Sequence, residues 1–265
     1  IIFFAMNIIT SLLVMKYGFS TNIKNLVVFF IYFFAIYPIF QTFTKEKSRV
    51  LFNLFFSVIT VTNTIGVFIS LVQFYLLIGY RVFDYKGLLI RQGFVESRLF
   101  GILASPNYLS IISLIIIIYL GMRLTFFSKL VKTLAISSIL LNFVYIVLSG
   151  SRTTYICLVV AAFLYSLVKF EFTNKLKSFV AVLLTVGLVF LSYNGVKYSS
   201  DLYLKAHSAE IQLNKEKGKN NNLTLERTDT SEENISNNRF AIWQSTASFI
   251  PKRPLFGYSA GNWYE

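Results

Sequence analysis

Three arginines, Arg98, Arg152 and Arg239, lie between or after long apolar runs of this sequence. Arg152 follows Ser149-Gly150-Ser151 in a short turn, and each apolar run beside that turn is long enough for a membrane helix. An ionisable residue at the edge of the hydrocarbon is costly and is by default a candidate for function. A guanidinium suits bidentate contact with phosphate, so these residues predict the binding of a phosphorylated, membrane-borne group. The plainer interpretation of each is a solvated charge, or one that reaches from a helix end to lipid head groups.

The composition is that of an integral membrane protein. The 265 residues are 55% hydrophobic and 14% charged, whereas average soluble domains carry about 25% charged residues. The net charge of +13 comes from Lys and Arg that gather between the apolar runs, where they set orientation and meet anionic lipid. No basic soluble domain is visible, so we expect no nucleic-acid partner. One cysteine and one histidine exclude a disulfide framework, and we expect neither a metal nor a cofactor.

The hydropathy pattern predicts an all-α, polytopic transmembrane protein with seven spans, because one span needs about 20 mostly apolar residues. These spans are predicted at residues 1–15, 26–43, 50–79, 105–122, 131–148, 153–168 and 178–196. Residues 80–104 are predicted to be a loop, of which Leu88–Val95 could lie flat on the membrane interface. Ser105-Pro106-Asn107 is a helix-start signal.

The polar segment 197–265 is predicted to be an extracytoplasmic loop that follows the membrane region 1–196. The chain begins with Ile inside an apolar run and ends without a closing helix, so we expect a piece of a longer protein, truncated within this loop. Short loops at 44–49, 123–132 and 169–177 are dense in Lys and Arg, which places them in the cytoplasm. The arginines would then face the outer boundary of the cell membrane, where the anion at that depth is a lipid diphosphate.

Several motifs match those of one family. The run from Arg98-Leu99-Phe100-Gly101 through Ser105-Pro106-Asn107 resembles the R-x-x-G…P-N segment of the O-antigen ligase / O-antigen polymerase superfamily. Ser149-Gly150-Ser151-Arg152 resembles its S-x-S-R turn. Asn238-Arg239 with Trp243, followed by Pro254-Leu255-Phe256-Gly257, resembles the start of its large outer loop. The order and spacing of the three motifs make the resemblance fairly specific.

The resemblance, which covers roughly residues 50–265, implies a bacterial membrane glycosyltransferase that uses undecaprenyl-diphosphate-linked glycans at the outer face of the inner membrane. It implies that Arg152, Arg239 and Arg98 bind the diphosphate, that Asn107 and Ser151 support them, and that no metal is needed. It also implies a general-base histidine beyond Glu265. The one histidine of the sequence, His207, is at the wrong place in the loop to be that base.

A polysaccharide polymerase is the favoured hypothesis, and an O-antigen-type ligase is the first alternative. The Ile-, Phe-, Lys- and Asn-rich composition suggests an AT-rich genome, and a Gram-positive cell with a capsule would lack lipid A as an acceptor. A lipid-glycan flippase or transporter is the second alternative, although no internal repeat of the kind many transporters show is visible. A membrane sensor would explain the outer loop but not the arginine at the turn. The expected partners are the lipid-linked glycan, membrane lipid, and a chain-length regulator or flippase of the same pathway.

Overall fold

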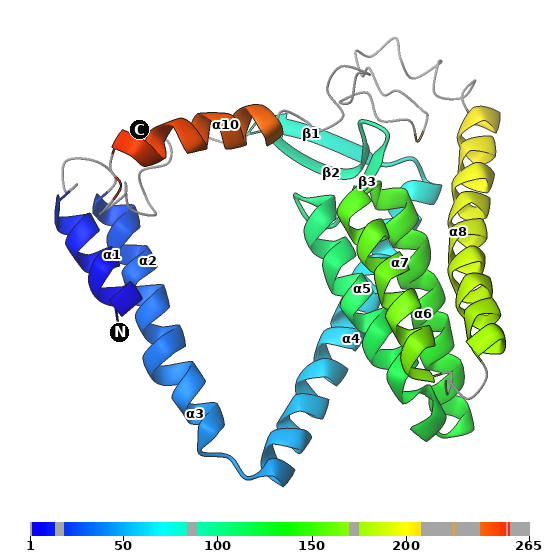
Figure 1. Cartoon of the computed structure of the whole chain (residues 1–265). Helices are drawn as coiled ribbons and strands as arrows, with labels where there is room; N and C mark the ends of the chain where they lie inside the picture. The colour runs from blue at the N-terminus through cyan, green and yellow to red at the C-terminus, as the bar shows by residue number, and fades with distance from the viewer. Residues whose placement is uncertain are drawn as a thin grey trace. The chain divides into compact units, whose positions relative to one another are not determined.

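Two compact units make up the structure, a computed structural model that describes residues 2–13, 19–83, 89–169, 175–207, 225, 239–252 and 254. One unit comprises Ile1–Leu54 with Asp229–Glu265, and the other comprises Phe55–Thr228. Figure 1 labels the helices and strands of both units. The predicted division at residue 196, and the side of the membrane on which residues 197–265 lie, stay predictions.

The first unit is helical in the residues that are described. It contains α1 (Ile2–Leu13), α2 (Phe19–Phe30), the π-helical η1 (Ile31–Ile36), α3 (Tyr37–Gln41), the first residues of α4 (Lys45–Tyr75), α10 (Arg239–Phe249) and η3 (Ile250–Lys252). Phenylalanines join α1 to the helix after it, because the ring centroids of Phe3 and Phe29, and of Phe4 and Phe34, are 5.7 Å apart. The π-helical turn directly precedes Tyr37-Pro38, where proline removes a backbone donor from the helix.

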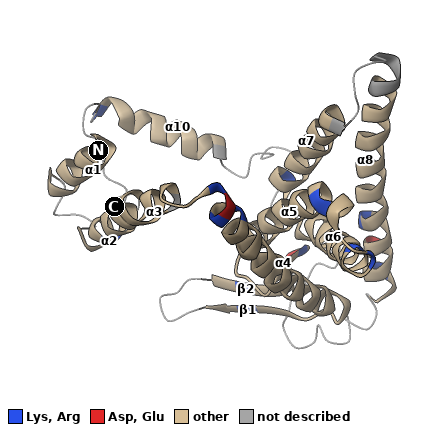
Figure 2. Ribbon diagram, turned by 90° about the horizontal axis from the view of Figure 1, so that it is seen from below, with Lys and Arg blue, Asp and Glu red and all other residues tan. Residues whose placement is uncertain are grey.

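The second unit is a helical bundle with a small sheet at one end. After the rest of α4 come β1 (Gly79–Phe83), β2 (Leu89–Val95), β3 (Arg98–Gly101), α5 (Pro106–Arg123), η2 (Leu124–Phe126), α6 (Lys129–Ser149), α7 (Arg152–Lys169) and α8 (Lys175–Ala206). Helix α5 packs along α6, α7 packs along α8, and β3 contacts both α5 and α6. In Figure 2 most of the helical ribbon carries no charge, as expected for helices that cross lipid.

Five helices of the described residues are long and apolar enough to cross a membrane. They are Phe19–Ile39, Lys45–Tyr75, Pro106–Phe126, Lys129–Ser149 and Phe179–Ala206. The apolar helices Ile2–Leu13 and Arg152–Val168 correspond to two further predicted spans but are shorter. A multi-pass helical membrane protein is therefore supported, while the predicted count of seven spans is not confirmed.

The small sheet corrects the all-α prediction and the predicted loop at 80–104. Its three strands are antiparallel in the order β1-β2-β3, with Arg81 opposite Arg91 and Val82 opposite Ile90. Branched and aromatic side chains are frequent in these strands, which favours the extended conformation, and cross-strand pairing satisfies backbone groups that an open loop would leave to water. Glu96 and Ser97 turn β2 into β3 with φ of +52° and +61°, as a two-residue hairpin turn of type I′ requires.

Helix α8 continues to Ala206, beyond the predicted end of the last span at residue 196. Near its end Tyr203 stacks on Tyr75 of α4, with ring centroids 5.6 Å apart, and its hydroxyl donates to the Tyr75 carbonyl. Leu204 is fully buried in a cluster that also holds Phe94 and Leu99 of the sheet. Apolar partners inside the protein thus extend the helix past the point where hydropathy falls.

A buried polar network joins α4, α5 and α6 midway along their length. Asn63 donates from Nδ2 to Asn142 Oδ1 over 2.8 Å and to Ser113 Oγ over 3.3 Å. The hydroxyls of Thr64 and Ser138 are 2.7 Å apart, and Asn142 Nδ2 donates to the Ser138 carbonyl over 2.8 Å. Among apolar helix faces that lipid solvates equally well, such bonds fix which faces meet.

Replacing Asn142 by leucine is expected to lower the free energy of unfolding by about 1 kcal/mol, because the amide of Asn63 loses a buried partner. Asn194→Leu is the matched control, since Asn194 also donates to the carbonyl four residues before it, over 2.8 Å, but faces outward on α8. Thermal unfolding of the purified protein in one detergent measures both variants. Equal midpoints for the two variants would contradict a role of the network in packing.

Candidate functional site

The turn between α6 and α7 is held in a conformation that glycine favours. Helix α6 ends at Ser149, and Gly150 follows with φ of +61° and donates its N–H to the Val147 carbonyl over 3.2 Å. A left-handed residue at this position is a common way to end a helix, and glycine adopts it without strain. Ser151 then donates its N–H to Ser149 Oγ over 3.3 Å, and α7 begins at Arg152.

Arg98 lies against this turn. Its Nε donates to the Ser149 carbonyl over 2.9 Å, and its Nη2 donates to Asn107 Oδ1 over 3.0 Å. A Cβ placed on Gly150 would lie 3.5 Å from Arg98 Nε, so the arginine packs directly on the glycine. The last carbonyls of a helix have no partner within it and carry the negative end of its dipole, so a guanidinium there is well placed. Arg98 therefore ties the end of α6 to the start of α5.

Hydroxyl groups complete the junction between α5 and α7. Thr154 Oγ1 lies 2.9 Å from Ser110 Oγ and 2.9 Å from Ser151 Oγ. Ser110 Oγ in turn donates to the Asn107 carbonyl over 2.9 Å. Ser110, Ser151 and Thr154 are all buried. The predicted supporting residues, Asn107 and Ser151, are thus linked by a chain of hydrogen bonds through Ser110 and Thr154.

Tyr145 anchors the strand that carries Arg98. The side chain is fully buried, and its hydroxyl lies 3.1 Å from the Phe100 carbonyl and 3.3 Å from the Leu99 carbonyl. Sequence reasoning missed Tyr145, Ser110 and Thr154. The sequence did contain a signal for Ser110 and Thr154. Each lies three residues after a motif residue, Asn107 or Ser151, and so on the same side of its helix.

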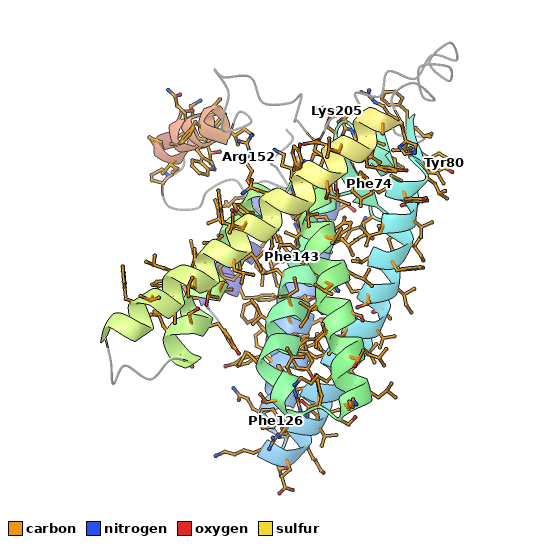
Figure 3. The ribbon with its side chains drawn as sticks, turned by 90° about the vertical axis from the view of Figure 1, so that its right-hand side faces the viewer. Phe74, Tyr80, Phe126, Phe143, Arg152 and Lys205 are labelled. Carbon is orange, nitrogen blue, oxygen red and sulfur yellow. The ribbon has the colours of Figure 1, made fainter. Side chains whose placement is uncertain are left out.

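Arg152 is the exposed member of the site. It is the first residue of α7, at the end of the bundle that also carries Lys205 and Tyr80 and opposite the end that carries Phe126 (Figure 3). The first N–H groups of a helix lack partners within it and favour anions. An exposed guanidinium at the start of a helix, beside a hydrogen-bonded turn, is an arrangement that can bind phosphate oxygens.

The remaining sequence candidates belong to other elements or lie outside the described residues. Arg239 opens α10 in the other unit, and its side chain is not among those described. His207 directly follows α8, with Nδ1 2.9 Å from the Tyr203 carbonyl. Four acidic residues of the segment 197–265 lie outside the described residues, namely Glu226, Asp229, Glu232 and Glu233. Within the described ranges no three His, Cys, Asp or Glu side chains are grouped to hold a metal ion.

Comparison with known proteins gives one match. A family model described as O-antigen ligase matches residues 137–265, a segment that contains the turn at Ser149–Arg152 and also Arg239, and that begins after Arg98 and Asn107. No curated protein and no solved structure gives a significant match.

Proposed function

Because this chain belongs to the O-antigen ligase superfamily of membrane glycosyltransferases, we propose that it joins glycan repeats linked to undecaprenyl diphosphate into a polysaccharide at the outer face of the cell membrane. The observation that carries the proposal is the exposed Arg152 at the start of α7, beside a turn that Arg98 and Asn107 hold in place. The superfamily suggests that the reaction is glycan transfer. Arg152 offers a positive charge that could bind the leaving diphosphate.

The reaction exchanges one bond at the anomeric carbon of the donor sugar. The bond from that carbon to the diphosphate oxygen breaks, and its electron pair stays on the diphosphate. A hydroxyl oxygen of the acceptor forms the new bond and gives its proton to a general base. Charge therefore grows on the leaving diphosphate in the transition state, and a fixed cation aimed at it lowers the barrier.

We assign direct contact with the diphosphate to Arg152. Arg98 is a positioning residue in this proposal. The two hydrogen bonds that support this role go to the Ser149 carbonyl and to Asn107 Oδ1. Arg239 is proposed as a further diphosphate ligand on the strength of the family motif. Guanidinium groups would supply the positive charge that a metal ion supplies in other transferases, so we propose a reaction without a metal. The general base is assigned to no described residue.

A ligase is the second candidate, favoured by the description of the matching family model. Ligases and polymerases differ in the acceptor, since a ligase moves the glycan from its lipid to a different molecule and a polymerase moves it to another lipid-linked repeat. The same leaving group serves both.

The test is to delete the gene, restore the full-length protein in a second strain, and weigh the lipid-linked glycans of both by mass spectrometry. A deletion strain that accumulates single repeats on the lipid at the outer face supports the polymerase. Long chains that remain on the lipid would show a ligase, and repeats retained at the cytoplasmic face would show a flippase. An unchanged lipid-linked pool contradicts every one of these glycan functions.

A further inference from the structure

The hairpin of β1 and β2 is tied to the membrane surface by its neighbours in the chain. Helix α4 ends at Tyr75 and β1 begins at Gly79, while β3 ends at Gly101 and α5 begins at Pro106. Both helices are candidate spans, and a few residues of connecting chain reach no more than about 3.5 Å each. In Figures 1 and 2 the two strands run sideways, away from the helices of their unit. The hairpin therefore extends along the plane in which the helices leave the lipid.

The described strands of this hairpin expose large apolar side chains on both faces. Tyr80, Val82, Phe83 and Ile90 are 52%, 58%, 68% and 40% exposed, respectively. Val82 and Phe83 are neighbours along β1, so their side chains point to opposite faces of the sheet. A sheet that meets the core on one side and water on the other has one polar face. Here Val82 and Ile90, which pair across the strands, share one face, whereas Phe83 exposes its ring on the other face beside Arg81 and Arg91, so both faces expose large apolar side chains.

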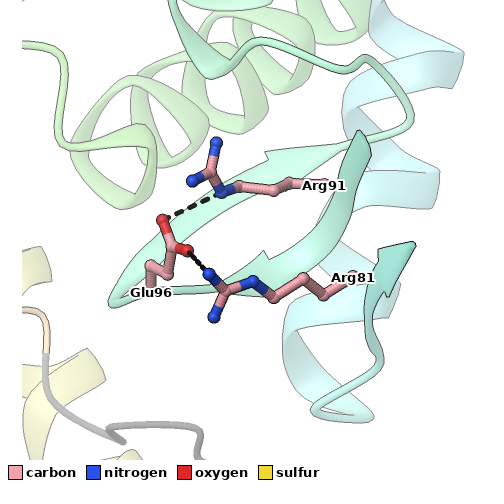
Figure 4. A network of polar contacts seen from close by, with 3 residues as sticks. All are labelled: Arg81, Arg91 and Glu96. Atoms are coloured by element: carbon pink, nitrogen blue, oxygen red, sulfur yellow. Dashed lines mark ion pairs between the residues drawn. The ribbon is translucent and has the colours of Figure 1, made fainter. Parts of the chain in front are cut away.

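Between Tyr80 and Val82 the hairpin carries a positively charged cluster. Arg81 and Arg91 are directly opposite each other in the ladder, an arrangement in which like charges repel. Glu96 lies between them, with Oε1 3.5 Å from Arg81 Nη2 and Oε2 3.0 Å from Arg91 Nε (Figure 4). The Arg91 guanidinium also lies 6.0 Å from the centroid of the Phe100 ring. One carboxylate between two guanidiniums leaves a net positive charge, and the Arg81 side chain is 56% exposed.

We propose that this hairpin is a lipid-docking element. Its exposed apolar side chains, those of Tyr80, Val82, Phe83 and Ile90, enter the interfacial layer of the membrane. Arg81 and Arg91 bind the phosphates of anionic phospholipids in the same layer. Aromatic and basic side chains together are the residues that anchor a protein at this depth. The occupant is a lipid surface because the hairpin projects from helices that cross lipid, and because its net charge is opposite to that of the head groups. This inference does not depend on the proposed glycan chemistry.

The test places a fluorescent label on the hairpin of the full-length protein in vesicles. The sequence has one cysteine, so Cys157→Ser provides a background for Val82→Cys, which is labelled with an environment-sensitive nitrobenzoxadiazole group. A spin label on the lipid acyl chain near the head group reports contact with lipid, and iodide reports contact with water. We expect the spin-labelled lipid to quench the label at residue 82 and iodide to leave it bright. Ile115→Cys, at an exposed position midway along α5, is the reference for lipid contact.

Two single substitutions change the cluster in opposite directions. Arg81→Gln removes the net charge and keeps the 3.0 Å pair of Arg91 with Glu96, whereas Glu96→Gln doubles the net charge. As phosphatidylglycerol replaces phosphatidylcholine, quenching by spin-labelled lipid should rise. It should rise less in Arg81→Gln and more in Glu96→Gln, because one basic residue near an anionic surface changes partitioning by about fivefold. Arg123→Gln, at the opposite end of α5, is the matched control and should behave like the parent.

Three results would overturn the inference. A label that iodide quenches in every vesicle would place the hairpin in water. A label that neither quencher reaches would show that protein covers the hairpin. Quenching by lipid that ignores phosphatidylglycerol and both charge variants would remove the arginines from lipid binding. Size-exclusion elution and thermal unfolding confirm that each variant is folded before it is scored.

Discussion

Replacing Arg152 by alanine should lower the turnover number for glycan transfer by about 10²–10³, the loss typical when one preorganised group that stabilises transition-state charge is removed. The charge on the diphosphate develops as the sugar leaves, so the turnover number should fall more than the affinity for the lipid-linked donor. Stability should fall by less than in Arg98→Ala, because the Arg152 side chain is exposed at the start of α7. Initial rates of transfer by the purified full-length protein, with the thermal midpoint measured beside them, check this.

Arg152→Lys and Arg123→Ala serve as controls for that result. Lysine keeps the charge but lacks the planar fork that grips two phosphate oxygens, so its rate should lie between those of arginine and alanine. Arg123 is an arginine at the opposite end of α5, and its removal should leave the rate unchanged. Wild-type rates in Arg152→Ala would exclude Arg152 from the reaction, whatever the superfamily.

Arg98→Ala should lower both activity and stability, and it should lower stability more than Arg152→Ala does. The arginine gives one hydrogen bond to the buried Ser149 carbonyl and one to Asn107 Oδ1. Hydrogen bonds to charged groups are worth about 1.5–3 kcal/mol each, so we expect a loss of about 2 kcal/mol or more in the free energy of unfolding. Once the turn is released, Arg152 no longer starts from a fixed position, and transfer should fall with it.

A double-mutant cycle with Asn107→Ala separates positioning from substrate contact. The two variants share one bond, so their combined loss of stability should be smaller than the sum of the single losses by about 1 kcal/mol. Arg98→Lys keeps the charge and one donor, so it should recover part of both stability and rate. An inactive Arg98→Ala protein that unfolds at the wild-type temperature would mean that Arg98 contacts the substrate instead.

Motifs in the sequence predicted the candidate site residues, and the structure shows which of them contact one another. Ser151 is far from Arg98 and Asn107 in the chain, and no periodicity would bring it to them. The family resemblance predicted their association. The resemblance predicted that Arg98 and Arg152 both bind the diphosphate. The sequence does not reveal that the Ser149 carbonyl, at the end of a helix, needs a hydrogen-bond donor. That need follows only from where α6 ends and from how Gly150 turns the chain.

The helices and the sheet differ in how far they could be predicted, for a physical reason. The length of an apolar run indicates its affinity for lipid. The predicted ends of α5 and α6 therefore lie within a few residues of the observed ends. The same measure does not report pairing between strands, so the sheet between Gly79 and Gly101 was missed. It also does not report helices that find apolar partners outside the lipid, so the last part of α8 was taken for a loop.

The unbroken course of α8 has a consequence for every residue that follows it. A helix advances about 1.5 Å and turns about 100° with each residue, so its 32 residues form a rod of about 48 Å, longer than the roughly 30 Å hydrocarbon layer. Figure 3 shows this rod running obliquely across its neighbours. The direction in which the chain leaves the helix is therefore set by helical phase. One residue inserted before Tyr203 would rotate Leu204 out of its cluster, whereas seven would return it to nearly the same face, about 20° away. Homologous chains can thus vary the length of this rod only in steps of whole turns if they keep its contact with the sheet.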